Sequence, residues 1–300
     1  MKMRLREKLV VGSVLLLLLG VGCSEEQDAK GQHLKLAGST TVEPVALTAG
    51  KDFMDQNPGV EVRVRGGGST IGVKGVGYGA LSIGMASRPI KPEELEKWPN
   101  LTTTAVGRDG VAVVVNKELY NAGVKQLTLE QVASIWLGKT TNWREVGGPD
   151  LTIVAFDKEM GRGTRDTFGK AVLGGEKIAA PGTSGALGEN EAVLAAVSGN
   201  KAAVSILSTG WQTAEVVGVA IVGKDGQAVA PTAEAVAAGR YAISRDLVVI
   251  TDGPPRGTAK EFIDFLLSPA GQTHVEKQGY TAVSSKGSLA ATKSSGSTAR

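Results

Sequence analysis

Three short turns hold the residues of this chain that are best suited to chemistry. They share glycine and hydroxyl residues, and their sequences are Gly38-Ser39-Thr40-Thr41, Gly66-Gly67-Gly68-Ser69-Thr70-Ile71-Gly72 and Gly161-Arg162-Gly163-Thr164-Arg165. Each turn follows a run that predicts a strand and leads into a pattern that predicts a helix. A helix start leaves backbone N–H groups free, Ser and Thr add O–H donors, and glycine lets the backbone approach a ligand closely. The pattern therefore predicts an oxyanion site.

Two further features extend this pattern. In the segment Ser87-Arg88-Pro89, Ser87 would donate to an anion and Arg88 would neutralise it, unless the segment is only a surface turn. Lys158, just before the third turn, would supply another cation, or is a solvated surface lysine. Ser and Thr also cap helices commonly, which alone explains any single turn. Three turns of the same design, one of them with two arginines, favour anion binding.

Catalytic and metal-binding motifs are scarce. The chain has two histidines, His33 and His274, and one cysteine, Cys23, which excludes a cysteine-rich zinc site and a disulfide framework. Neither histidine is close in sequence to a candidate nucleophile, and a Ser or Thr nucleophile needs a base. The glycine-rich turns also lack the Gly-Lys-Ser/Thr order of a Walker P-loop. We therefore expect no catalytic residue, no metal and no cofactor.

The first 22 residues predict a secretory signal peptide. A basic start precedes the apolar run Leu9–Leu19, which is too short to span a bilayer comfortably. The sequence Leu19-Gly20-Val21-Gly22-Cys23 resembles a bacterial lipobox, with Gly20 where the usual Leu stands. The alternative is an ordinary signal peptide with an incidental cysteine. We expect a lipoprotein anchored to a membrane through Cys23, in the periplasm or at the cell surface, with residues 23–32 as its tether.

The net charge also belongs to the signal peptide. The formal charge is +3, and residues 1–22 contain four basic residues and one acidic residue. The rest of the chain is therefore close to neutral. Such a balance gives no support for binding nucleic acid or an acidic membrane surface.

Short apolar runs alternate with helical patterns along the rest of the chain. Strands are expected at 33–37, 60–65, 81–86, 102–106, 111–116, 151–156, 202–207, 216–221 and 247–251. Helices are expected at 42–56, 128–137, 164–173, 189–198, 232–238, 259–267 and 269–278. This alternation predicts an α/β fold with mostly parallel sheets. Residues 285–300 are mainly small and polar with little to bury, so we expect a disordered tail.

In their order along the chain, these motifs resemble the phosphate-binding protein family of bacterial phosphate ABC transporters, from about Leu34 to Val283. The resemblance is carried by segments 37–44, 66–72, 83–89, 109–116, 127–130, 142–143, 161–168 and 262–272. It implies the periplasmic-binding-protein type II fold, with two α/β lobes and a ligand cleft between them. Lobe 1 would comprise residues 33–107 and 244–284, and lobe 2 residues 108–243. The crossing hinge strands would lie near 102–116 and 241–251.

The resemblance also implies which residues bind the anion. The expected ligand set is Ser39, Thr40, Thr41, Ser69, Thr70, Ser87, Arg88, Lys158, Arg162, Gly163 and Thr164. Lys158 stands where many members have Arg. Arg162 replaces the usual Ser, so its guanidinium either adds charge to the site or points away and leaves only backbone there.

One position bears on selectivity. Some members have Asp where this chain has Arg88, and a carboxylate there accepts the proton of phosphate and repels sulfate. If Arg88 replaces that carboxylate, another acceptor is needed, and the candidates are Asp157, Asp109 and Glu43. Oxyanion binding is therefore better supported by the sequence than selectivity for phosphate.

The function that the resemblance implies is capture of inorganic phosphate outside the inner membrane and its delivery to an ABC permease. A monomer would close around the buried anion by hinge motion. The alternatives are a binding protein for another tetrahedral oxyanion such as sulfate, molybdate or tungstate, a phosphatase-like enzyme, and a surface phosphate sensor on the same fold.

Overall fold

The computed structural model describes residues 32–283. The expected signal peptide, the lipidation site at Cys23, nearly all of the tether and the expected tail from residue 285 lie outside these residues. Among the helices of residues 32–283, none combines the length and the apolar character needed to cross a membrane.

The elements near the two ends of the described chain form one lobe. Its parallel strands lie in the order β2 (Val60–Gly67), β1 (Gln32–Gly38) and β3 (Ile83–Ala86). Its helices are α1 (Glu43–Gln56), α2 (Ser69–Gly77), α3 (Pro92–Lys97), α9 (Gly257–Leu267) and α10 (Pro269–Lys277). In its core, Leu36 and Met85 of the strands pack with Phe53 of α1 and Phe262 of α9. The two phenylalanine rings meet edge to face with centroids 5.3 Å apart, which joins the first helix of the lobe to one of its last.

The middle of the chain forms the second lobe. Its main strands are β8 (Ala203–Ser208), β6 (Val154–Lys158), β7 (Thr183–Leu187) and β9 (Val216–Gly218), and a smaller sheet has the order β11 (Ala228–Val229), β10 (Ala220–Val222), β5 (Gln126–Thr128). Its helices are α4 (Lys117–Asn121), α5 (Leu129–Trp136), α6 (Gly163–Phe168), α7 (Asn190–Ser198) and α8 (Ala233–Ala237). Short 3-10 helices cover 143–146 and 209–211, and a π-helical turn covers 169–173. Trp136, Trp143 and Phe168 are buried in its core.

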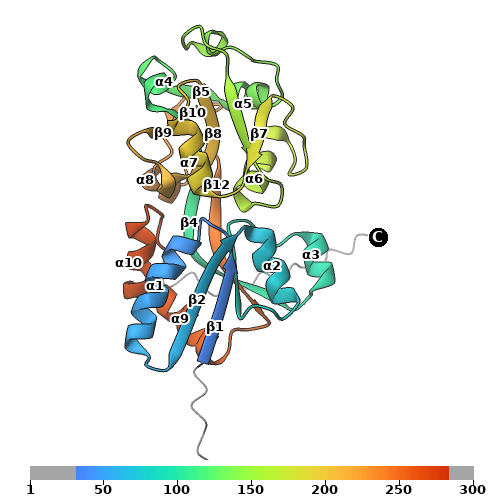
Figure 1. Cartoon of the computed structure of the whole chain (residues 1–300), viewed down its shortest axis with the longest axis vertical. Coiled ribbons are helices and arrows are strands. Elements are labelled where there is room, and N and C mark those ends of the chain that lie inside the picture. The colour runs from blue at the N-terminus through green and yellow to red at the C-terminus, as the bar shows by residue number, and fades with distance from the viewer. Residues whose placement is uncertain (1–31, 284–300) are drawn as a thin grey trace, which may run out of the picture. The chain divides into compact units, whose positions relative to one another are not determined.

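Two strands run through both lobes. In β4 (Leu101–Asn116), residues 101–110 pair with β12 (Ser244–Asp252), and residues 111–115 pair with β8. β12 pairs on its other side with β3 of the first lobe. Figure 1 shows β4 and β12 running between the two groups of elements. The two-lobed α/β architecture with crossing strands is therefore as expected, and the lobe boundaries 33–107 plus 244–284 and 108–243 stay a prediction.

The expectation of mostly parallel sheets is wrong. Strands that belong to a single lobe pair largely in parallel, as in β1–β2, β1–β3, β6–β7, β6–β8 and β5–β10. β4 and β12 pair antiparallel with each described neighbour. The reason is that β4 leaves the first lobe and β12 returns to it, so the two strands run in opposite directions through one sheet. The strands expected at 102–106 and 111–116 are likewise one continuous strand.

Candidate anion-binding site

A small pocket lies between the two lobes. The first lobe contributes the turns before α1 and α2 and the residue after β3, and the second lobe contributes the end of β6 and the start of α6. The lining residues are Ser39, Thr40, Thr41, Gly68, Ser69, Ser87, Lys158, Arg162, Gly163 and Thr164. The three turns that the sequence pattern singled out thus meet at one point. Of the expected ligand set, Thr70 and Arg88 are not in this lining.

Glycine allows the turns of the first lobe to approach one another closely. Gly38 has a φ of +138°, and a Cβ atom on it would lie 2.1 Å from the carbonyl oxygen of Met85. The carbonyl of Gly38 accepts a hydrogen bond of 2.7 Å from the N–H of Gly68, and the N–H of Ser39 donates to Met85 at 2.9 Å. The ends of β1, β2 and β3 are therefore fixed relative to one another around the pocket.

The second lobe is closed on the first. A Cβ atom on Gly163 would lie 2.3 Å from the hydroxyl oxygen of Ser87 and 2.5 Å from that of Ser69, so only glycine fits at this approach. Nearby, the N–H and the hydroxyl of Thr70 both donate to the carbonyl of Gly161, at 3.3 and 2.8 Å. Thr70 therefore links the lobes and does not face the pocket.

The hydroxyl groups around the pocket are arranged as hydrogen-bond donors. Arg245 donates to Oγ1 of Thr41 at 3.2 Å and to Oγ1 of Thr164 at 3.0 Å, and the N–H of Ser87 donates to Oγ of Ser69 at 3.1 Å. An oxygen that accepts such a bond keeps its own proton for a ligand. Four lining residues also have backbone N–H groups without a hydrogen-bond partner in residues 32–283, namely Thr40, Ser69, Gly163 and Thr164. The pocket thus presents donors from both lobes.

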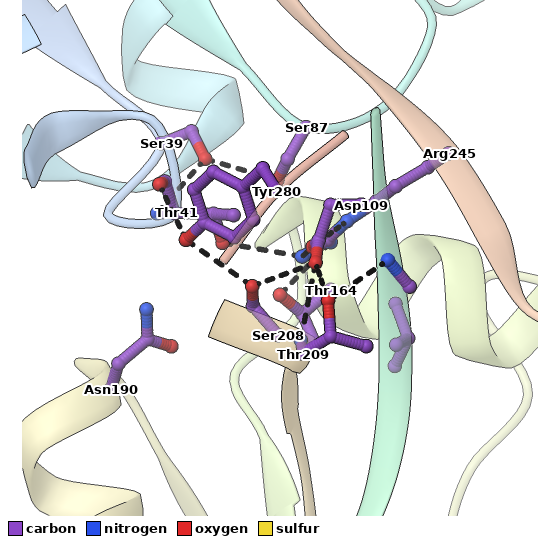
Figure 2. A network of polar contacts seen from close by, with 12 residues as sticks. Ser39, Thr41, Ser87, Asp109, Thr164, Asn190, Ser208, Thr209, Arg245 and Tyr280 are labelled. Atoms are coloured by element: carbon purple, nitrogen blue, oxygen red, sulfur yellow. Dashed lines mark hydrogen bonds and ion pairs between the residues drawn. The ribbon is translucent and has the colours of Figure 1, made fainter. Parts of the chain in front are cut away.

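Arg245 and Asp109 form the polar centre of the crossing strands, as Figure 2 shows. The buried guanidinium donates twice to Oδ2 of Asp109, at 3.0 and 2.7 Å. The other carboxylate oxygen accepts bonds from the hydroxyl of Ser208 and from the backbone and hydroxyl of Thr209. Because both oxygens of Asp109 are occupied, Arg245 is held in place. Its remaining N–H groups reach the two lobes.

Sequence reasoning missed Arg245. The signal that was available is a basic residue and an acidic residue, Arg245 and Asp109, in two segments that were both expected to cross between the lobes. Each stands beside an apolar run, where a lone charge would need a partner. The structure shows that each residue is the partner of the other.

Tyr280 supports the first turn from the C-terminal end of the described chain. Its hydroxyl donates to the carbonyl of Thr41 at 3.0 Å. Burial, together with the charge of Asp109, raises the pKa of Tyr280, so the phenol stays protonated and remains a donor. The backbone of the first turn is thereby fixed from a second side.

Lys158 at the end of β6 supplies a buried amine. The residue is 2% exposed, and its Nζ donates to Oδ1 of Asn190 at 2.5 Å. The lysines that form ion pairs within residues 32–283 are others, namely Lys91, Lys170, Lys201 and Lys260. Burial, and then the charges of Arg162 and Arg245, lower the pKa of Lys158 to about 7. The expected cation is therefore in the pocket, and no described carboxylate neutralises it.

Arg162 lines the pocket, but its guanidinium is occupied elsewhere. Nη2 lies 2.9 Å from a carboxylate oxygen of Glu159, and Nη1 lies 2.9 Å from a carboxylate oxygen of Glu189. Of the two alternatives raised by the sequence, the geometry matches the one in which the side chain points to other partners. Arg162 is the N-cap residue of α6, and its own N–H donates to the carbonyl of Glu159 at 3.3 Å.

Arg88 is placed among carboxylates and not at the pocket. Its guanidinium donates to both carboxylate oxygens of Glu94 at 2.8 Å, and its Nε lies 2.9 Å from Asp166 of the second lobe. Lys91 adds a second cation on Asp166, at 2.8 Å. The expected role of Arg88 in neutralising the anion therefore has no geometric support, because its charge is already matched.

The candidate acceptors for a phosphate proton lie outside the pocket lining. Asp157 is paired with Arg165 at 2.6 Å, and Asp109 is paired with Arg245. Glu43 lies beside Gly66, where burial and then the charge of Glu189 raise its pKa. In the described chain the lining contains no carboxylate. Within residues 32–283, moreover, no group of three or more His, Cys, Asp or Glu side chains is placed to hold a metal ion.

Comparisons with known proteins show which family the chain resembles. The sequence profile of the PBP superfamily domain matches residues 24–270. The chain is 33% identical over 266 residues to the phosphate-binding protein PstS of Bacillus subtilis, which covers 87% of this chain and 85% of that protein. It is 29% identical over 279 residues to PstS of Staphylococcus aureus, which covers 89% of this chain and 83% of that protein.

Solved structures of the same kind share the fold. A phosphate ABC transporter substrate-binding protein from Clostridium perfringens, with phosphate bound, has a TM-score of 0.77 and 33% identity, and the match covers 84% of this chain and all of that one. An ABC-type phosphate transport receptor from Vibrio cholerae has a TM-score of 0.68 and 29% identity over 83% of this chain. The expected two-lobed periplasmic-binding-protein fold is confirmed. The chain therefore belongs to the PBP superfamily and, within it, to the PstS family of phosphate-binding proteins.

Proposed function

We propose that this protein captures inorganic phosphate outside the cytoplasmic membrane and delivers it to an ABC permease. The observation that carries the proposal is a pocket between two lobes whose polar groups are hydrogen-bond donors with one buried amine. Such a set suits an anion with oxygens on every side. The PstS relatives are named for phosphate binding, and the Clostridium perfringens structure contains phosphate.

The ligands in this proposal are donors from both lobes. The first lobe supplies the N–H and hydroxyl groups of Thr40 and Ser69 and the hydroxyl of Thr41, and the second supplies Gly163, Thr164 and the amine of Lys158. Ser39 and Ser87 are hydrogen-bonded to each other at 3.0 Å and complete the wall of the pocket. Charge-assisted hydrogen bonds such as the one from an ammonium are about twice as strong as neutral ones.

Closure of the lobes would trap the anion, with the crossing strands β4 and β12 as the hinge. Arg245 on β12 contacts Thr41 of one lobe and Thr164 of the other, so it holds both hydroxyls toward the same point. In the open state these two threonines would separate and the pocket would lose half of its donors. Binding and closure are therefore coupled through the same groups.

Export and anchoring complete the proposal. Residues 1–22 would direct secretion, and a lipid on Cys23 would hold a monomeric protein at a membrane, in the periplasm or at the cell surface. The protein would bind its ligand without chemical change, because no histidine of the described chain lines the pocket to serve as a base for a hydroxyl nucleophile.

Isothermal titration calorimetry of the full chain in detergent, with phosphate, sulfate, molybdate and tungstate in competition, tests the proposal. We expect one phosphate per chain and weaker binding of the other three anions. Sustained hydrolysis of a phosphate ester by the pure protein would instead support a phosphatase-like enzyme.

A second candidate is a binding protein for a fully deprotonated anion such as sulfate. The observation that favours it is that the pocket lining within residues 32–283 has no carboxylate to accept a phosphate proton or to repel sulfate. Tighter binding of sulfate than of phosphate in the same competition experiment would establish this candidate and overturn phosphate as the ligand.

A further inference from the structure

The charges that face Lys158 do not include a matched anion. Arg162 acts from the start of α6 and Arg245 from β12, and Glu189 and Glu191 at the start of α7 act on it with smaller effect. Arg245 is neutralised by a carboxylate of its own, and the guanidinium of Arg162 already holds Glu189. The Lys158 amine, in contrast, has the neutral amide oxygen of Asn190 as its hydrogen-bond partner.

An ammonium in this place is costly while the pocket is empty. Burial of a charged group without a counter-ion disfavours the charged form, and nearby positive charges disfavour it further. The neutral amine can still donate an N–H to Oδ1 of Asn190, so that contact does not depend on protonation. An oxyanion in the pocket would reverse the balance because it supplies the missing negative charge within contact distance.

We propose that phosphate binding is coupled to the uptake of one proton by the Lys158 amine, an inference that rests on the proposed function. Above neutral pH, hydrogen phosphate enters, a proton from water or buffer adds to Nζ, and an ammonium–phosphate pair forms. Near neutral pH, where part of the amine is still unprotonated, dihydrogen phosphate can bring the proton itself, which passes from a P–OH group to the lone pair on Nζ. Only O–H and N–H bonds change, and the charges balance in both routes. Both routes end in the same pair, an ammonium on Lys158 beside hydrogen phosphate.

Calorimetry at pH 8.5 with inorganic phosphate, in two buffers of different ionisation enthalpy, counts the protons. For the full wild-type chain we expect about one proton taken up per phosphate, and a loss of affinity of about tenfold for each pH unit above 7.5. Lys158→Arg keeps a permanent cation, so we expect it to take up almost no proton and to bind with nearly constant affinity over this range. The change in protonation of phosphate itself is common to both proteins and cancels in the comparison.

Two further variants serve as a second test and as a control. Asn190→Asp retains the lysine and places a carboxylate against Nζ, which holds the amine charged, so proton uptake should be lost there too. Lys139→Arg makes the same chemical change at an exposed position and should behave as the wild type. Circular dichroism checks that each variant is folded.

The outcomes separate this inference from the proposed function. Phosphate binding without proton uptake in the wild type, or equal uptake in Lys158→Arg and wild type, would overturn the role of Lys158 and leave phosphate binding intact. No phosphate binding by the wild type at any pH would overturn both.

Discussion

Two groups of cations lie at the interface between the lobes, and they are neutralised in different ways. The first group, here called the flank, consists of Arg88 and Lys91 of the first lobe with Asp166 and Glu176 of the second. Arg88 and Lys91 both contact Asp166, at 2.9 and 2.8 Å, and Lys91 also contacts Glu176 at 2.7 Å. In the pocket, Lys158 has an amide oxygen as its partner and no carboxylate among residues 32–283. Arg88 and Asp166 on the flank and Lys158 in the pocket are all buried, so the difference between them is one of charge balance and not of exposure.

The difference separates what holds the lobes together from what binds the ligand. A complete set of buried ion pairs joins the lobes whether or not an anion is present, and the loss of one partner leaves an uncompensated charge. A buried cation without a carboxylate partner, as in the pocket, is unfavourable until an external anion supplies the negative charge. The flank is therefore expected to set the stability of the closed protein, and the pocket is expected to set its affinity.

The largest effect should come from Asp166→Asn on the flank. The change leaves Arg88 and Lys91 short of a negative charge, and breaking a buried pair in this way costs about 3 kcal/mol of unfolding free energy. Phosphate affinity should change by less than about tenfold, because Asp166 does not line the pocket. Urea unfolding followed by circular dichroism, together with calorimetry, measures the two quantities.

Asp264→Asn is the matched control for this variant. Asp264 pairs with Lys260 on an exposed face of α9, where an ion pair contributes at most about 0.5 kcal/mol. If Asp166→Asn were as mild as the control in urea, the flank would not carry the stability assigned to it.

The next largest effect is expected for Lys158→Met, which should weaken phosphate binding and raise the stability of the empty protein. Removing the buried amine should weaken phosphate binding at pH 7 by about 30-fold or more, since loss of one partner of a buried charge pair costs at least about 2 kcal/mol. The same change removes an unmatched cation from the empty protein, so the midpoint of thermal unfolding without phosphate should rise. A variant that unfolds earlier and still binds phosphate normally would show that Lys158 is structural.

The sequence was informative about the site wherever the signal is local. A strand, a glycine-rich turn with hydroxyls and a helix start are neighbours in the chain, so the turns with Ser39, Ser69 and Gly163 could each be predicted to bind an anion, and the family resemblance implied that they share one site. The roles of Arg88 and Arg245 were different. Each depends on a carboxylate far away in the chain, Asp166 and Asp109 respectively, and single-chain patterns do not encode such pairings.

For the fold too, local features could be predicted from the sequence and pairings between distant segments could not. Most of the expected helices and strands lie within a few residues of the observed ones, because apolar periodicity is local, whereas α4, β5, β7 and β11 were not predicted. The direction of pairing was predicted wrongly for the crossing strands, because it depends on where β4 and β12 lie relative to each other. The alternation of strands and helices describes each lobe separately and carries no information about strands that leave one lobe for the other.

The unfolding free energy measured at several pH values isolates the contribution of Lys158 in the pocket from that of the flank. Its pKa is about 7 in the folded protein, mainly through burial, and about 10.4 in an unfolded chain. Between these values the unfolded chain binds more protons, so stability of the empty protein rises with pH and falls as pH drops toward 7, by at most about 1.4 kcal/mol per pH unit. We expect this slope between pH 7 and 9 in the difference between wild type and Lys158→Met, measured by urea unfolding. Saturating phosphate should flatten it, and a slope equal to zero without phosphate would contradict a neutral Lys158.

The smallest effect should come from Arg162→Ala, although Arg162 lines the pocket. Its guanidinium already contacts Glu159 and Glu189, whose side chains are 52% and 45% exposed, so the lost ion pairs contribute little to stability. The two carboxylates that remain would repel an anion, and we expect phosphate affinity to fall by about threefold in calorimetry at low salt. The double variant Arg162→Ala/Glu189→Gln removes one of these carboxylates and should recover part of that loss. If Arg162→Ala instead weakened binding as strongly as Lys158→Met, the guanidinium would have to contact phosphate directly.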